Sequence, residues 1–205
     1  MTLQRIVPWI AAALIGVTSI FAHAQAGKSP DALIKDVSTD VLDSVRADKS
    51  IKQGDVTKII GLVDAKVMPY VDFQRMTASA VGRYWRQATP EQQKQLQDAF
   101  KILLVRTYSG ALAQVQNQTV EVLPMRSQPT DKEVVVKTQI KGGGDPIQLD
   151  YRLEQSSAGW KIFDVNVLGV WLVENYRNSF SEQISAGGID GLISKLQARN
   201  KSNGS

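Results

Sequence analysis

Apolar residues in the first half of the chain recur at intervals of three and four residues, which is the spacing of an amphipathic helix. The first such segment spans residues 30 to 47, with Ser29 at the N-cap position and Pro30 in the first turn. A second starts after residues 53 to 55 and is interrupted at Pro69, and a third covers residues 72 to 86. The pattern therefore predicts three helical segments before the longest one.

That longest periodic segment spans residues 91 to 116. Thr89 can cap it, Pro90 stands where its missing N–H is harmless, and Gln92 can complete a capping box. Its apolar residues are Leu96, Phe100, Leu103, Leu104, Tyr108, Ala111, Leu112 and Val115. The spacing predicts a long helix with one face against the core.

The period then changes from helical to alternating, which predicts a sheet in the second half of the chain. Val120 and Val122 start the first strand, and residues 134 to 140, 147 to 153 and 160 to 167 supply three more. Three consecutive glycines at residues 142 to 144 predict a hairpin turn rather than a phosphate-binding loop, because no helix follows them. The result is an antiparallel meander of about four strands.

The last of these strands is apolar on both parities. Trp160 and Ile162 fall on one parity, and Phe163, Val165 and Val167 fall on the other. A strand that is apolar on both faces is expected to be covered on both.

Helical spacing returns after Gly169, from Trp171 to Ile184, and a short last helix is predicted around residues 192 to 196. Residues 201 to 205 form a polar tail that is predicted to be disordered. Helices first, an antiparallel sheet next and helices last define an α+β fold in one domain.

The first 26 residues have the form of a secretory signal peptide. Arg5 precedes an apolar run from Ile6 to Phe21, and the triplet at residues 24 to 26 has the small-x-small pattern of a cleavage site. The apolar run is short for a membrane span, so cleavage is favoured over a retained anchor. The mature domain is then predicted to cover residues 27 to 200.

The amino-acid composition excludes most classes of catalytic and metal site. The single histidine, His23, lies in the predicted signal peptide, and the chain contains no cysteine. Triads with histidine, cysteine nucleophiles, disulfides and the usual zinc, haem and iron–sulfur ligands are therefore excluded from the mature protein, and we predict no metal or cofactor. Removing Arg5 from the 24 Lys and Arg leaves 23 against 20 Asp and Glu, a net charge of +3. Such mild, scattered charge is not typical of a nucleic-acid binder.

Three carboxylates in the predicted sheet are candidates for a catalytic role. Asp150 and Glu154 fall on the polar parity of a strand, where a solvated position is expected. Asp164 lies within an apolar strand, where an ionised carboxylate needs partners. We expect it to hold a nearby arginine, such as Arg177 or Arg83, in a structural pair.

Several stretches of the chain, taken in order, form a recognisable signature. They are Val71-Asp72-Phe73, Val81-Gly82-Arg83-Tyr84-Trp85-Arg86, Thr89-Pro90-Glu91-Gln92, residues 100 to 108, Asp150-Tyr151-Arg152-Leu153, residues 159 to 165, Gly169-Val170 and Asn175-Tyr176-Arg177. Over residues 30 to 197 the chain resembles the periplasmic toluene-tolerance auxiliary family, the soluble phospholipid carriers of the Mla pathway. Trp171 departs from the family pattern, which usually has a small polar residue there, and it either narrows a pocket mouth or alters packing at the corner between sheet and helix.

The resemblance implies a curved antiparallel sheet, clasped by N- and C-terminal helices around an apolar pocket for the acyl chains of a glycerophospholipid. It implies a periplasmic carrier, not an enzyme, that maintains outer-membrane lipid asymmetry. Its expected partners are an outer-membrane lipoprotein–porin complex and an inner-membrane ABC transporter with an MCE-domain ring.

We expect the lipid-binding residues to come from the helices and the sheet, although parity leaves open which strand face lines the pocket. These residues are Tyr84, Phe100, Leu103, Leu104, Tyr108, Val136, Ile147, Leu149, Tyr151, Val165, Val167 and Val170. Two other functions stay open from the residues alone. One is a periplasmic hydrolase or isomerase with a pocket Asp and Tyr, and the other is a structural adaptor with a filled core.

Overall fold

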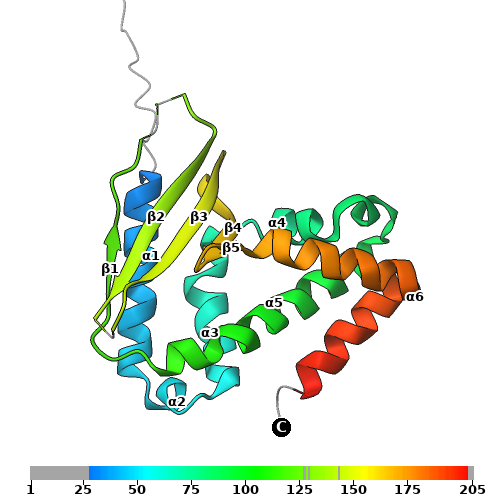
Figure 1. Ribbon diagram of the computed structural model, residues 1–205, viewed down its shortest axis with the longest axis horizontal. Coiled ribbons are helices and arrows are strands. Elements are labelled where there is room, and N and C mark those ends of the chain that lie inside the picture. Colours follow the sequence, from blue (N-terminus) through cyan, green and yellow to red (C-terminus); the bar gives the residue numbers. More distant parts are fainter. Residues whose placement is uncertain (1–27, 127, 129, 143, 203–205) are drawn as a thin grey trace, which may run out of the picture.

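The structure is a computed structural model that describes residues 28–126, 128, 130–142 and 144–202, so the predicted signal peptide lies outside it. The chain forms a run of helices, then an antiparallel sheet, then one long helix (Figure 1). In order, the elements are α1 (Pro30–Ala47), α2 (Lys49–Lys52), α3 (Val56–Lys66), η1 (Met68–Tyr70), α4 (Phe73–Val81), η2 (Gly82–Gln87), α5 (Pro90–Ala113), β1 (Thr119–Val122), β2 (Glu133–Lys141), β3 (Ile147–Ser156), β4 (Gly159–Val167), β5 (Val170–Trp171) and α6 (Leu172–Ser202). The predicted α+β class is confirmed.

The helix starts follow the predicted signals. The capping box of α5 is complete: Gln92 N donates to Thr89 Oγ1 at 3.2 Å, and Thr89 N donates to Gln92 Oε1 at 3.0 Å. Ser29 occupies the N-cap of α1 but makes no side-chain capping bond. Helix starts with proline at the first position are thus confirmed for both α1 and α5.

The prediction of one continuous helix over residues 72 to 86 is wrong, because α4 ends at Gly82. This glycine has φ +65°, a left-handed conformation that interrupts the helix, and the tighter helix η2 follows it. A similar break occurs in α6 at Gly188, where φ is +70°, so the long helix is bent into two arms (Figure 1). Helix α6 continues to Ser202, two residues into the segment predicted as a tail.

The sheet is an antiparallel meander in the order β1-β2-β3-β4-β5. Its fifth strand is short, and it contains Trp171, which the sequence pattern had placed in the following helix. Trp171 pairs with Asn166 of β4, so the helix starts one residue later, at Leu172. Sheet and α6 are therefore joined without any intervening loop.

A β-bulge explains the two apolar parities of β4. The register shifts so that Leu153 of β3 opposes Ile162, whereas Arg152 opposes Asp164, which leaves Phe163 as the extra residue. Because the bulge changes parity, Trp160 and Ile162 share one face with Val165 and Val167. The expectation that both faces of β4 are broadly apolar is wrong. On the opposite face Phe163 lies under the guanidinium of Arg75, 3.6 Å from the ring centroid.

The core has three parts, one of which joins α1, α2, α3 and α5 around the fully buried Val45 and Ile59. The other two border the sheet and the helical arm. The helical part packs α4, α5 and α6 around the fully buried Phe100 and Phe180. The second part packs α1 against one face of the sheet, through Leu33 and Ile34 on the helix and Val136 on β2. Figure 1 shows α1 packed against the sheet, and the helices α4, α5 and α6 forming a helical arm that extends away from the sheet.

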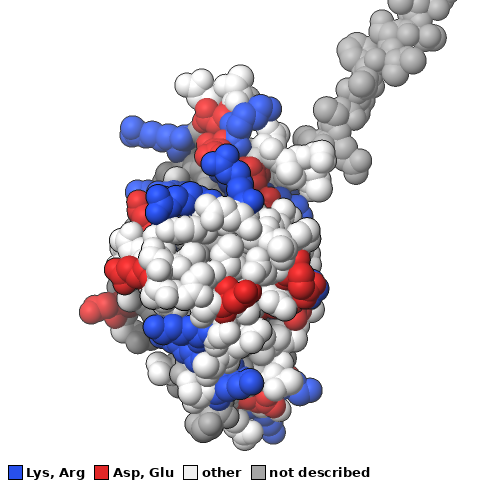
Figure 2. Space-filling view, turned by 90° about the vertical axis from the view of Figure 1, so that its right-hand side faces the viewer, with Lys and Arg blue, Asp and Glu red and all other residues white. Residues whose placement is uncertain are grey.

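Charged side chains are mixed in sign over the surface at the α6 end (Figure 2). Lys101 is paired with Asp64 at 2.7 Å, and Lys94 is paired with Asp98 at 2.6 Å.

Within the described ranges, no helix is long and apolar enough to cross a membrane.

Candidate functional site

A cavity lies between α1 and the sheet. It has a volume of about 210 Å³ and is built from α1, the α3–α4 connection, the end of α5 and four strands. The lining residues are Ile34, Val37, Ser38, Val41, Leu42, Val67, Val71, Leu112, Val120, Ile140, Leu149, Tyr151, Ile162 and Val165.

This lining is hydrocarbon apart from two hydroxyl groups, those of Ser38 and Tyr151. Burial raises the pKa of Tyr151, so its phenol is neutral at physiological pH. The lining includes no charged side chain, and elsewhere in the described ranges no cluster of Asp and Glu is arranged to hold a metal ion. Such a chamber favours an apolar ligand and offers no strong acid, base or nucleophile.

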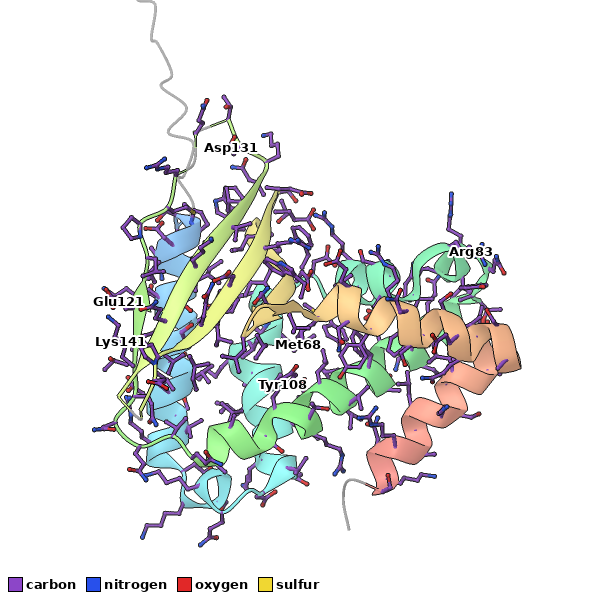
Figure 3. The ribbon with its side chains drawn as sticks, viewed as in Figure 1. Met68, Arg83, Tyr108, Glu121, Asp131 and Lys141 are labelled. Atoms are coloured by element: carbon purple, nitrogen blue, oxygen red, sulfur yellow. The ribbon has the colours of Figure 1, made fainter. Side chains whose placement is uncertain are left out.

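A second, more polar cleft of about 540 Å³ adjoins the cavity, and Ile140 contributes to both walls. Its lining is Ala111, Ala113, Gln114, Val115, Gln116, Gln118, Ile140, Gly142, Asp145 and Ile147. We call this space the amide-rimmed cleft, because three glutamines form part of its edge. At the same end of the sheet Lys141 and Glu121 form an ion pair across β1 and β2 (Figure 3). An apolar chamber beside a polar cleft suits a ligand with an apolar body and a polar end.

The sheet residues predicted from the sequence lie on the face that meets this cavity. Leu149, Tyr151 and Val165 are in its lining, and Ile147 is in the lining of the amide-rimmed cleft. On the same face, Val136 opposes Tyr151, and Val167 opposes Leu149. Val170 follows on β5, where it opposes Val167 and is half exposed. The structure thus identifies which strand face adjoins the cavity.

The predicted helical residues are placed elsewhere. Phe100 and Leu103 are fully buried in the helical core, and Leu104 packs against it. Tyr108 is half-buried on α5 (Figure 3), and the Tyr84 hydroxyl lies 3.3 Å from Ser185 Oγ. These five residues are outside the lining of the cavity.

The helix that supplies most of the helical lining is α1, a role that was not predicted from the sequence, and α5 contributes only Leu112. Ile34, Val37, Val41 and Leu42 come from α1. Their signal was visible as the apolar stripe of the first helix, but a stripe alone shows only that a helix face is buried.

The model of one protein family, described as MlaC protein, matches residues 35–198. The chain belongs to the MlaC family. It is 25% identical over 166 residues to the toluene tolerance protein ttg2D of Pseudomonas putida, covering 80% of this chain and 77% of that relative. It is 24% identical over 178 residues to the intermembrane phospholipid transport system binding protein MlaC of Haemophilus influenzae, covering 85% and 83% of the two chains.

Among solved structures, the fold of this MlaC-family chain is similar to a phospholipid-binding protein from Ralstonia solanacearum in complex with a phospholipid. The TM-score is 0.83 and the identity is 46%, and the match covers 85% of this chain and 98% of the other. The resemblance to the toluene-tolerance family that the sequence motifs indicated is confirmed.

Two expectations about acidic residues of this MlaC-family chain are corrected. The partner of Asp164 is Arg152, whose Nη1 donates to Asp164 Oδ2 at 3.0 Å. Of the arginines expected there, Arg177 donates to Ser79 O and Arg83 to the Tyr84 hydroxyl. Asp150 is only 6% exposed rather than solvated, and its carboxylate accepts bonds from Gln148 Nε2. The other carboxylate on the polar parity, that of Glu154, is paired with Arg75.

Asp164 connects the sheet to α6. Its Oδ1 accepts from Val165 N at 2.9 Å and from Val173 N, in the first turn of α6, at 3.1 Å. Burial raises the pKa of Asp164, and the hydrogen bonds and Arg152 oppose that rise in part. The Arg152 guanidinium also stacks on Trp171, 3.8 Å from the ring centroid. Because Arg152 is on the sheet face opposite the cavity, Trp171 packs at the corner between sheet and helix, outside the cavity lining.

Proposed function

We propose that this protein is a periplasmic carrier that holds the acyl chains of a glycerophospholipid in the cavity between α1 and the sheet. The headgroup would lie at the amide-rimmed cleft, in contact with water. The observation that carries the proposal is the charge-free apolar cavity beside a polar cleft, in an MlaC-family chain that is 46% identical to a protein solved with a phospholipid.

The energetics suit a carrier. Moving one CH₂ group out of water contributes about 0.8 kcal/mol, so two acyl chains contribute more than ~20 kcal/mol of gross transfer free energy. A bilayer offers the lipid nearly the same gain. The difference between cavity and bilayer is therefore small, and the lipid can be released again.

The cavity must widen to accept two chains. At about 210 Å³ it is below the range of roughly 300–1,000 Å³ that is usual even for drug-sized ligands. Since α1 supplies one wall and the sheet supplies the other, we expect these two layers to separate when lipid enters.

We propose that the carrier exchanges lipid with an outer-membrane lipoprotein–porin complex and with an inner-membrane ABC transporter that has an MCE-domain ring. The signal-peptide pattern of residues 1–26 supports a periplasmic location. An enzymatic role has less support, since Tyr151 meets no carboxylate in the lining. A structural adaptor with a filled core would not need the cavity.

Native mass spectrometry of protein purified from cells tests this function. The wild-type protein should carry the additional mass of a phospholipid, and Leu149→Glu should not, because an unpaired charge in the cavity is costly. Val135→Glu is the matched control, since Val135 lies on the opposite sheet face and is 40% exposed.

Leu149→Trp keeps the test valid if Leu149→Glu does not fold, since it fills the cavity without adding a charge. A folded Leu149→Trp protein that retains lipid at wild-type stoichiometry would remove this cavity from the proposal. Wild-type protein without lipid would contradict the carrier function itself.

A further inference from the structure

The turn between β4 and β5 contains a leucine that has an unfavourable backbone conformation and a side chain exposed to water. Leu168 and Gly169 form a two-residue turn between the paired residues Val167 and Val170. Leu168 has φ +52°, the one positive φ among the non-glycine residues that the structure describes. Its side chain is also 66% exposed.

A different residue would suit this turn better. Both of its central residues have positive φ, +52° and +91°, which is the pattern that favours Asn or Asp followed by Gly. A bulky residue in that conformation is uncommon and strained, and such strain is concentrated at functional positions. The surrounding structure holds the turn: the buried Asn166 accepts through Oδ1 from Gly169 N at 2.8 Å, and Leu168 N donates to Gln148 O at 3.2 Å.

Leu168 is accompanied by two other exposed apolar side chains. Ile147 is 44% exposed and Val170 is 50% exposed. The bond from Leu168 N to Gln148 O joins the turn to the start of β3, directly beside Ile147. We call these three residues the apolar tip. Apolar surface that is gathered in one place marks a contact site more often than single exposed residues do.

The apolar tip adjoins the candidate site. Ile147 is part of the amide-rimmed cleft, and the next residue on the same face of β3, Leu149, lines the cavity. Val167, between the tip and the cavity, opposes Leu149. An apolar path therefore continues along one sheet face from the cavity wall to the exposed tip.

The charge around the tip favours a protein partner over a membrane surface. Two basic residues adjoin the tip: Lys141 follows Ile140, which opposes Ile147, and Arg152 stacks on Trp171, which follows Val170. Each is paired with a carboxylate, Lys141 with Glu121 and Arg152 with Asp164. Segments that bind anionic membrane surfaces usually combine apolar residues with several basic ones that are free to meet the lipid headgroups.

We infer that the apolar tip inserts into an apolar socket of the inner-membrane ABC transporter complex with which this carrier is proposed to exchange lipid. This inference rests on the proposed carrier function. With Leu168 in the socket, the acyl chains would pass from the cavity to the partner along a continuous apolar surface, without exposure to water. Leu168 would supply the docking contact in spite of its unfavourable backbone conformation.

The test compares Leu168→Asn with wild-type protein loaded with a fluorescent phospholipid. Transfer is measured to bare vesicles of phosphatidylethanolamine and phosphatidylglycerol, and to the same vesicles containing the reconstituted ABC transporter with its MCE-domain ring. Asn relaxes the turn, so the melting temperature should be unchanged or higher. Transporter-dependent transfer should fall about tenfold, which corresponds to about 1.4 kcal/mol of binding free energy.

Two controls accompany this variant. Val135→Thr removes exposed apolar surface away from the tip and should transfer lipid like the wild type. Native mass spectrometry should show the same lipid occupancy in Leu168→Asn and in the wild type, because Leu168 is outside the cavity lining.

Three results would overturn the inference. Wild-type transfer by Leu168→Asn in both assays would remove the tip from docking. An equal loss with bare vesicles would identify the bilayer, and not a protein socket, as the surface that the tip contacts. A wild-type protein that never carries lipid would contradict the carrier function on which the inference depends, and native mass spectrometry detects that case separately.

Discussion

Two parts of the core, the helical part and the part between α1 and the sheet, use apolar residues in different ways. In the helical part, aromatic rings fill the space: the Phe100 ring is 5.0 Å from Tyr176 and 5.1 Å from Phe180, centroid to centroid, in edge-to-face contacts. In the part between α1 and the sheet, the lining is mostly Val, Leu and Ile, and about 210 Å³ remains open. Both parts are apolar, so side-chain shape and backbone spacing, and not hydrophobicity, decide which part is filled.

The largest expected effect is in the filled part. Phe100→Ala should cost about 3–5 kcal/mol of unfolding free energy, because Phe100 is fully buried and three other rings would lose their contact with it. Chemical denaturation measures this cost. Lipid occupancy in the surviving folded protein should stay at the wild-type level, and its loss would show that the filled part also contributes to binding.

A pair of leucines compares the two parts directly. Leu96→Ala, at a fully buried position of the helical core, should cost an amount in the upper half of the usual range of about 2–5 kcal/mol. Leu149→Ala should cost about 2 kcal/mol or less, because Leu149 already borders open space. Equal losses in denaturation experiments would mean that the cavity wall is packed as tightly as the helical core.

A smaller effect is expected where the two parts meet. Asp164→Asn should lower the unfolding free energy by about 1–2 kcal/mol, since an amide cannot replace all of the bonds from Arg152 and from the backbone of α6. Thermal unfolding measures the change. Lipid should remain bound in the folded fraction, because Asp164 is outside the cavity lining.

The smallest expected effect is a change with pH in the stability difference between Asp164→Asn and the wild type. Burial raises the pKa of Asp164 above its ordinary value of 3.8, so the folded state holds the proton more tightly than the unfolded state does. The stabilisation from this group is therefore fully present below the unfolded pKa and is lost as the pH rises through the folded pKa. The stability deficit of Asp164→Asn should narrow as the pH increases from about 4 to about 7. A deficit that widens over this interval would show that ionised Asp164 is the more stabilising form.

Much of the fold was predictable because its signals are local. The capping box at Thr89 and the alternation in β2 and β3 act over a few residues and predict α5 and the meander well. The change from one helix to another between residues 184 and 192 was predicted, and it occurs at Gly188. The break at Gly82 was not, since a glycine within a helical pattern does not reveal its φ. The bulge at Phe163 was missed because register depends on the neighbouring strand.

The candidate site was predictable only in part. Alternation shows that Leu149, Tyr151 and Val165 share a face, and the cavity adjoins that face. Periodicity shows equally well that Phe100 and Val37 are buried, but it carries no information about what packs against each of them. Phe100 meets other rings, whereas Val37 meets the cavity, and that difference depends on tertiary distances.

The bulge in β4 makes the architecture sensitive to strand register as well as to chemistry. If Phe163 took a regular place opposite Leu153, Ile162 and Trp160 would turn to the opposite sheet face, and the wall that they form with Val165 would be interrupted. A register shift of one residue at this point would thus be more disruptive than most substitutions in the same strand. One residue without a direct partner in the ladder determines which sheet face the residues before it present.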